Sequence, residues 1–129
     1  MANQFVVELK NQPGGLATLA EALAERGIDL RAIGGGGIGD TGHIIMTTAD
    51  DDAARKVLEA GGYTFIEGES ILTEVDDRPG GMARLSRSLA DAGVNIYGHL
   101  FLGRWGDRAM FAFVVDDPDR ARPILERKG

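Results

Sequence analysis

Apolar and polar residues follow two different rhythms along the first part of the chain. Residues 5–10 are rich in β-branched and aromatic side chains and predict a strand. In the next segment, four apolar residues of 16–23 recur at i, i+3, i+4 and i+7, which predicts an amphipathic helix. Gly27 stands where the C-terminal cap of that helix belongs.

The pattern continues with two strands, a second helix and a final strand. Residues 28–33 and 43–48 alternate as strands do, and the glycines between them predict a break and a long hairpin. Asp50 or Asp51 is placed to cap the second helix, and residues 63–67 form a further strand. This order predicts an α+β, ferredoxin-like βαββαβ sandwich, with an antiparallel sheet and two helices on one face.

The same pattern then returns. Pro13 and the two glycines after it reappear at Pro79, and the same register shift, applied without a gap, sets Asp50 against Asp116. Self-similarity over such a length indicates a duplicated domain. The second copy is expected to form strands at 71–76, 94–102 and 109–115 and helices at 81–92 and 117–127.

Two small domains account for the chain, with residues 1–68 as the first and residues 69–129 as the second. Domains of about 60 residues bury only roughly 60% of their unfolded surface and are marginal alone. The linker between the copies is short. We therefore expect the copies to dock together and the pair to form a homodimer.

The second copy departs from the first in two places. The residues that would match 63–67 are missing, so this copy is expected to lack its own last strand and to leave a sheet edge open. Pro123 falls inside the expected last helix. Because proline removes a hydrogen bond and clashes with the preceding turn, we expect this helix to kink or to start late.

Composition narrows the function. The net charge is -6 and the pI about 4.8, which disfavours nucleic acid and anionic membranes as partners, since both attract basic surfaces. There is no cysteine, and hence no disulfide or thiolate metal site. The first residues lack the features of a signal peptide, and no apolar run is long enough to span a membrane. These features predict a cytoplasmic protein.

Motifs for cofactors, metals and catalysis fail on their context. The glycines at 34, 36 and 39 match the dinucleotide fingerprint in letters, but a strand follows where that motif needs a helix. His43 and His99 lie in different strands of different copies, without a third ligand for zinc. No nucleophile motif is present. A small hydrolase on the same fold is a minor alternative, because Arg78 lies in a suitable turn.

The two Pro-Gly-Gly turns are the candidate binding elements. Paired glycines leave no side chain over the start of the following helix, whose amides are then free to bind an anion. Asn11 and Asp77 precede the prolines by two residues, where they either cap the helix or accept the ammonium of an amino acid. Asp29 and Asn95, at the start of the next strand, are placed to complete the polar set.

The segments NQPGGLATLAEALAERGIDL and DDRPGGMARLSRSLADAGVNI resemble the first half of ACT domains. Chains of two such copies are similar to stand-alone tandem ACT proteins, including glycine cleavage repressor-like proteins, which sense amino acids without catalysing a reaction. In this family the ligand lies at a domain interface, between the turn of one domain and the second strand of its neighbour.

The resemblance implies a set of ligand-binding residues in each copy, at the turn and after the helix. They are Asn11, Gly14, Gly15, Leu16 and Asp29 in the first copy and Asp77, Gly80, Gly81, Met82 and Asn95 in the second. Serine-binding members carry a histidine before the turn, where this chain has Leu9 and Val75, so serine specificity is not implied.

The expected protein is a cytoplasmic, non-catalytic regulatory homodimer without cofactor or metal. It would bind a small amino acid or related metabolite and modulate a separate partner protein, with no nucleic acid or membrane as partner. The alternative is a module with the same fold that binds no metabolite and serves only protein interaction or dimerisation.

Overall fold

The computed structural model describes residues 3–126 and forms two compact units, Met1–Gly68 and Glu69–Gly129. The elements of the first part are β1 (Asn3–Lys10), α1 (Gly15–Glu25), β2 (Leu30–Ile38), β3 (Thr41–Thr48), α2 (Asp51–Ala60) and β4 (Phe65–Glu69). Those of the second part are β5 (Ile71–Asp76), α3 (Gly81–Asp91), β6 (Ile96–Trp105), β7 (Arg108–Val115) and α4 (Pro118–Leu125).

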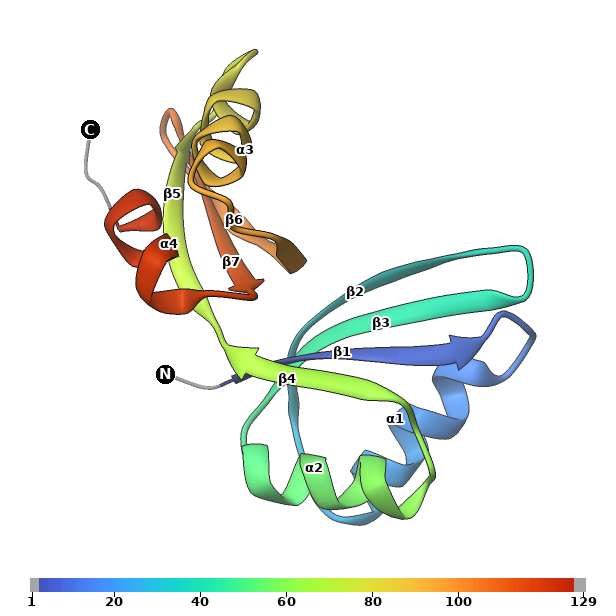
Figure 1. Cartoon of the computed structure of the whole chain (residues 1–129). Helices are drawn as coiled ribbons and strands as arrows, with labels where there is room; N and C mark the ends of the chain where they lie inside the picture. Colours follow the sequence, from blue (N-terminus) through green and yellow to red (C-terminus); the bar gives the residue numbers. More distant parts are fainter. Residues whose placement is uncertain (1–2, 127–129) are drawn as a thin grey trace. The chain divides into compact units, whose positions relative to one another are not determined.

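Each unit is a sheet covered on one face by two helices (Figure 1). The first sheet has the order β2-β3-β1-β4, and β3 runs antiparallel to both β1 and β2. The second sheet has the order β5-β7-β6. Both the ferredoxin-like α+β class and the lack of a fourth strand in the second sheet are confirmed for residues 3–126.

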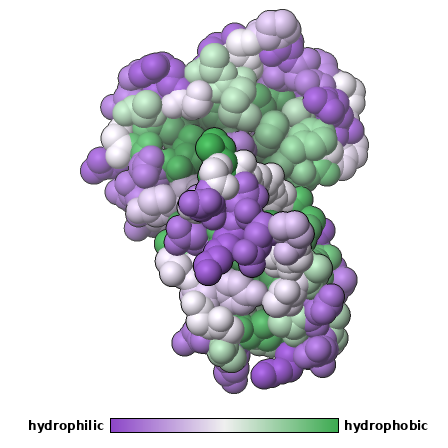
Figure 2. Space-filling view, turned by 90° about the vertical axis from the view of Figure 1, so that its right-hand side faces the viewer, coloured by the Kyte–Doolittle hydropathy of each residue, from purple (hydrophilic) through white to green (hydrophobic). Residues whose placement is uncertain are grey.

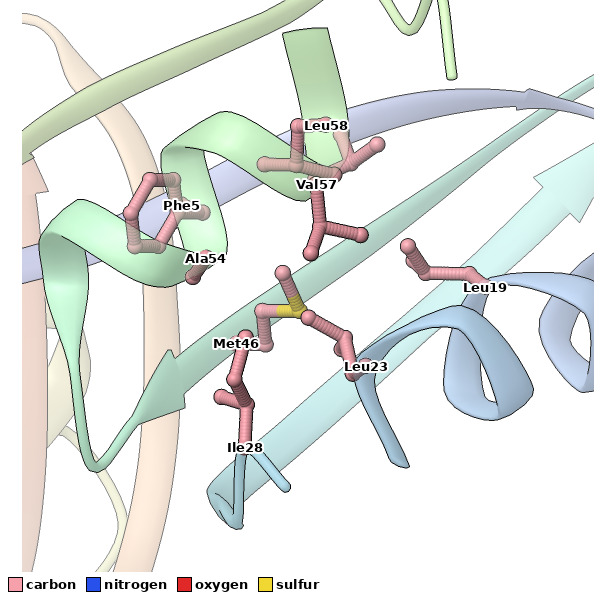
Figure 3. Packing of buried hydrophobic residues seen from close by; sticks show 9 residues of the cluster. Phe5, Leu19, Leu23, Ile28, Met46, Ala54, Val57 and Leu58 are labelled. Atoms are coloured by element: carbon pink, nitrogen blue, oxygen red, sulfur yellow. The ribbon is translucent and has the colours of Figure 1, made fainter. Parts of the chain in front are cut away.

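The core of the first unit lies between its sheet and its helices. Met46 of β3 is fully buried, and side chains of both helices point toward it, among them Leu23 and Val57 (Figure 3). Burying an aliphatic or aromatic side chain of this size stabilises the fold by about 1.5–3 kcal/mol. The helical periodicity of residues 16–23 identified the buried face of α1 in part: Leu19 and Leu23 lie inside, whereas Leu16 is 48% exposed.

The second unit has its own smaller core. Leu89 of α3 and Leu125 of α4 are buried against Ile71 and Phe113 of the sheet. The hydroxyl of Thr73, also buried, donates to the carbonyl oxygen of Leu125 at 2.5 Å. This bond ties the end of α4 to β5, the strand at the open edge.

The second helix of each unit begins at an aspartate, as predicted. Asp50 accepts a hydrogen bond from the amide of Ala53 at 3.1 Å, and Asp117 accepts one from Arg120 at 3.1 Å. An N-cap of this kind contributes about 1 kcal/mol. These bonds fix where α2 and α4 start.

Asn11 and Asp77 do not cap the first helix of their units, so this expectation is wrong. The N-cap positions of α1 and α3 belong to Gly14 and Gly80, with φ of +90° and +92° and no side-chain cap. A left-handed backbone there favours glycine. The polar residues lie three positions earlier, too far back to reach the first-turn amides as a cap does.

The glycine run forms part of a strand and does not interrupt it, which corrects the sequence-based expectation. β2 continues through Gly34 to Gly37 and keeps its pairing with β3, Gly35 opposite Ile44 and Gly37 opposite Gly42. A Cβ at Gly35 would collide with the backbone of β3 at the carbonyl of His43. The two strands approach closely because no side chain separates them.

The gapless register shift between the copies is wrong in the second half of each unit. The hairpin tips place Gly39 (φ +61°) and Gly106 (φ +60°) in the same turn position. The caps of α2 and α4 are Asp50 and Asp117, so Asp116 is not the counterpart of Asp50. Gly106 and Asp117 each lie one residue later than the shift between Pro13 and Pro79 would place them. The second unit therefore contains one extra residue before its hairpin tip.

The extra residue lies in β6. The pairing of β6 with β7 loses register between Phe101 and Gly103, which makes Leu102 the inserted residue. Gly103 has φ of +152°, and a Cβ there would meet the Trp105 ring at 3.0 Å. A bulge absorbs one residue locally and leaves the pairing on either side intact.

Pro123 does not delay the start of α4. The helix begins at Pro118, directly after its Asp117 cap, and runs to Leu125 with Pro123 inside it. The expected late start is therefore wrong. Ala121 and Leu125, on the buried face, are 0% and 1% exposed, and this packing offsets the hydrogen bond that proline cannot make.

An arginine on α2 joins the two strands at one side of the first sheet. Arg55 binds Glu67 of β4 through two hydrogen bonds of 2.6 and 2.7 Å, and Asn3 of β1 donates to Glu67 at 2.7 Å. Asp52 accepts a third bond from Arg55 at 2.9 Å. Hydrogen bonding by the Arg55 guanidinium holds the pKa of Glu67 below its ordinary value.

The second unit has an equivalent of Arg55, but within residues 69–126 its sheet has no equivalent of β4, the strand that carries Glu67. Arg122 corresponds to Arg55 and binds Asp119 at 2.7 Å, as Arg55 binds Asp52. Its other partner is Glu69, at 3.0 and 2.5 Å, which occupies the place of Asn3. The unit thus supplies from its own first residue the carboxylate that a fourth strand would have brought.

Replacing Glu67 by glutamine is expected to lower the stability at pH 7 and to matter progressively less in acid. The folded pKa of Glu67 lies below the unfolded value of about 4.3, so its stabilisation is complete above that value and is lost as the pH falls through the folded pKa. Thermal melts from pH 7 to pH 3 should show a gap of a few degrees in Tm that closes in acid.

Glu59→Gln is the matched control, because Glu59 is an exposed glutamate on α2, the helix that carries Arg55. Its melting curve should stay parallel to that of the unaltered protein over the whole pH range. A gap for Glu67→Gln that persists undiminished at pH 3 would contradict the electrostatic account.

Candidate functional site

The turn between β1 and α1 exposes the start of the helix. After Pro13, Gly14 turns the chain, and the amide of Gly15 donates back to the carbonyl of Gln12 at 3.3 Å. The bond from Thr18 to the carbonyl of Gly14, at 2.9 Å, is the first that spans a helical turn. The amides of the preceding turn lie at the positive end of the helix dipole.

Asn11 fastens this turn to the tip of the β2–β3 hairpin. Its backbone amide donates to the carbonyl of Asp40 at 2.9 Å, and its side-chain nitrogen donates to the carbonyl of Gly39 at 2.9 Å. Among the residues that the structure describes, none donates to the side-chain oxygen of Asn11. That oxygen remains an acceptor for a bound molecule.

The absence of a side chain at residue 37 is what gives Asn11 its place. A Cβ on Gly37 would lie 2.6 Å from both Cγ and Oδ1 of Asn11, well inside contact distance. The amide group of Asn11 therefore lies directly against the backbone of β2. This close approach brings the turn and the second strand together in one site.

A pocket of about 460 Å³ opens between the turn and the glycine-rich strand. Its lining comes from β1, the turn, α1, β2 and β3, and consists of Leu9, Lys10, Asn11, Gln12, Gly15, Leu16, Ile33, Gly34, Gly35, Gly36, Gly37, Gly42, His43 and Ile44. The volume falls within the range of small-molecule sites, about 300–1,000 Å³.

The lining groups suit a small molecule that carries both charges. The amides at the helix start favour an anionic group, such as a carboxylate. The side-chain oxygen of Asn11 and the backbone carbonyls of a bare strand suit an ammonium. Leu9, Leu16 and Ile33 add apolar surface for a side chain. The residues that line the pocket include no hydroxyl or thiol nucleophile.

The surface around these elements is mixed in character. Figure 2 shows the molecule from the side to which the β2–β3 hairpin points in Figure 1, and hydrophilic and hydrophobic residues alternate across it. Exposed apolar residues of the first unit include Leu16 (48%), Ile33 (46%) and Ile38 (91%). The first two line the pocket, so its rim offers contact area as well as charge.

The pocket brings together some of the predicted residues of the first copy. Asn11, Gly15 and Leu16 line it, whereas Gly14 lines an adjoining hollow that shares several residues with it. Asp29 follows the far end of α1, which is about 16 Å long. It forms an ion pair with Arg31 at 3.2 Å and lies outside the pocket.

The predicted residues of the second copy are distributed differently. Asp77 accepts a hydrogen bond from Arg104, and Asn95 donates its backbone amide to Asp116. Gly81 lines a pocket of about 300 Å³ that also contains arginine side chains. The two remaining members are near the start of α3, Gly80 as its N-cap and Met82 as an exposed residue.

Sequence reasoning missed part of the lining of the first pocket. Gly34 to Gly37 were interpreted as a break in the strand, although each pairs with β3, and Lys10 and His43 were not assigned to the site. The detectable signal was the glycine run itself, because a glycine-lined strand allows a ligand or another backbone to come close. No pattern in the sequence marks Lys10.

No group of three or more His, Cys, Asp or Glu within residues 3–126 could hold a metal ion. In the same part of the chain, no helix is long and apolar enough to cross a membrane.

Comparison with solved structures places the fold among known ones. Protein BT0572 from Bacteroides thetaiotaomicron is 23% identical, with a TM-score of 0.71, and the match covers 97% of this chain and 86% of that one. The regulatory subunits of aspartate kinase from Thermus flavus and Thermus thermophilus are each 22% identical, with TM-scores of 0.67 and 0.63. These matches cover 98% and 97% of this chain, and 90% and 87% of theirs.

Sequence comparison finds one similar family. No curated protein sequence matches the chain. The family model of the ACT domain matches residues 4–60, which run from β1 to the end of α2 and contain the turn, the glycine-rich strand and most of the first core. Over residues 4–60, the chain is therefore similar to the ACT domain family.

Proposed function

We propose that this protein is a cytoplasmic, non-catalytic regulatory module that binds a small amino acid in the pocket of its first unit and thereby modulates a separate partner protein. The observation that carries the proposal is the approach of Asn11 to Gly37, which builds one pocket from the turn and the second strand. The ACT family match, and structures of the same fold named as regulatory subunits of aspartate kinase, support it.

The bound amino acid would lie along the bare strand. Its carboxylate would meet the amides at the start of α1, while its ammonium would meet the side-chain oxygen of Asn11. Its side chain would contact the apolar residues Leu16 and Ile33. A molecule with only one of the two charges would leave one of these polar groups without a partner, and we expect it to bind less tightly.

Regulation would follow from linkage between binding and assembly. β2 is an edge strand of the first sheet, so the pocket lies beside an edge to which a second domain can be added. A ligand held by both sides of such an interface favours the assembled state by its differential affinity for that state. A homodimer with ligand at its interface is therefore the proposed active form.

A ligand-free interaction module is the second candidate. The observation that favours it is Ile38, an apolar residue 91% exposed at the end of β2. An exposed apolar side chain on an edge strand suits a protein contact without any metabolite. In this case the polar groups of the pocket serve only to fasten the turn to the hairpin.

A thermal-shift screen of the twenty amino acids, each at 10 mM, distinguishes the candidates. A ligand present at 100 times its dissociation constant stabilises the native state by about 2.7 kcal/mol, so at least one amino acid should raise the Tm by several degrees. Asn11→Ala should lose that shift. A flat profile on folded protein would instead favour the interaction module.

Two neighbouring glycines provide a matched pair of variants. Gly37→Ala is expected to displace the side chain of Asn11 and to weaken amino-acid binding about tenfold or more, because the flexible amide can move away while the fold remains. Gly36→Ala adds a methyl group that meets no atom within 4 Å and should bind nearly as before. Isothermal titration of both variants checks the difference, and equal affinities would contradict the proposed role of Asn11.

The amino acid that stabilises the protein should also promote its assembly. Sedimentation velocity at several protein concentrations, with and without 10 mM of that amino acid, should show a shift toward dimer in its presence, because linkage is reciprocal. Asn11→Ala serves as the control and should show the same distribution under both conditions. A distribution unchanged in the unaltered protein would rule out assembly as the output.

A further inference from the structure

In the second unit, a side chain of the same unit fills the position that corresponds to the pocket. Gly37 pairs with Gly42 across the first hairpin, and Arg104 pairs with Ala109 across the second. Arg104 follows Gly37 in the sequence by the same number of residues as Gly106 follows Gly39, the glycine at the other hairpin tip. Arg104 therefore stands where the first unit has Gly37.

Asp77 occupies the place of Asn11. Each donates its backbone amide to the residue at the hairpin tip, Asn11 to the carbonyl of Asp40 at 2.9 Å and Asp77 to that of Asp107 at 2.8 Å. The turn and the strand therefore face each other in both units. What differs is the side chain on the strand.

The acceptor of the second unit already has a cationic partner. Arg104 donates from Nε to a carboxylate oxygen of Asp77 at 2.8 Å. Its guanidinium carbon lies 4.7 Å from the centre of the Phe101 ring, in cation–π contact. The arginine thus fills the position in which the ammonium of an amino acid would bind in the first unit.

Large side chains on β6 also fill the space beside this ion pair. Leu100 and Phe101 of β6 correspond to Gly34 and Gly35, as their partners across each hairpin show. The Phe101 ring packs at 5.6 Å from that of Phe111. An exposed ion pair is weak by itself, so the volume of these side chains matters as much as the charge of Arg104.

We infer that Arg104 closes the second copy of the binding site, so that each chain binds one amino acid, in its first unit. Arg104 is then a specificity-determining residue: its guanidinium pairs with the Asp77 carboxylate and occupies the space beside it that an ammonium would need. The inference rests on the proposed function, because it states which of two related sites accepts the amino acid.

The test uses ¹⁵N NMR spectra of the full chain with each of the twenty amino acids at 10 mM. The amide signals of Gly34 and Gly36 should move with at least one amino acid, whereas those of Gly103 and the indole of Trp105 should not. Calorimetric titration with the same amino acid should give one site per chain. In Arg104→Gly the signals of Gly103 and Trp105 should begin to respond.

Two variants guard against a failure to fold. Arg104→Ala removes the same guanidinium without adding backbone freedom to β6 and should show the same gain of response, though smaller because of its methyl group. The reciprocal variant, Gly37→Arg, should abolish the response of the first unit. The unaffected signals of each spectrum report whether the variant is folded.

The ion pair can be checked without any amino acid. The Nε–H signal of Arg104 should be visible in the unaltered protein and be lost or shifted in Asp77→Ala. Identical signals in both proteins would show that the pair does not form, and would overturn the inference. A response of Gly103 and Trp105 in the unaltered protein would also overturn it while leaving the proposed function intact.

Two other outcomes complete the design. If the first unit responds to an amino acid but neither Arg104 variant opens the second, Arg104 is not what closes that site and the inference fails. If no amino acid moves any signal in the unaltered protein or the variants, the proposed function fails, and the inference that depends on it fails too.

Discussion

The bond between the first turn and the hairpin tip is the constraint on which the rest of each unit depends. It is a backbone hydrogen bond, made by residue 11 in one unit and by residue 77 in the other. Because no side chain is needed to make it, the sequence at both ends is free to vary. The bond fixes which residue of the second strand lies opposite the turn, and that residue decides what the space can hold.

The two units illustrate how little change separates an open pocket from a filled one. In the first, Gly37 lets the amide of Asn11 lie against the strand and leaves about 460 Å³ open beside it. In the second, Arg104 bonds to Asp77. This exchange acts together with the bulky residues Leu100 and Phe101 and the bulge at Leu102, while the three strands around the site keep the same order in both sheets.

Periodicity and turn residues were sufficient to predict the elements, because burial and capping are local effects. The helical spacing of residues 16–23 and the aspartate at Asp50 identified a buried face and a helix start. Long-range pairing is not encoded in this way. That Gly34 to Gly37 continue a strand depends on β3 lying beside them, and the inserted residue becomes visible only through the register of β6 with β7.

The candidate site was predicted in part for the same reason. Asn11, Gly15 and Leu16 share a turn, so the sequence places them together, and they do line one pocket. Lys10 and His43 join them through the fold alone. The aspartate at residue 29 was expected nearby because it opens the next strand, yet a whole helix separates it from the turn.

Glu69 has a consequence for how charge is balanced in the second sheet. With asparagine at that position, like Asn3 in the first unit, Arg122 would have the exposed Asp119 alone as its carboxylate partner among residues 69–126. With glutamate in place, the arginine has a bidentate partner. Equivalent arginines of the two units are thus neutralised by carboxylates at different positions of the fold, so each unit achieves local electroneutrality by its own route.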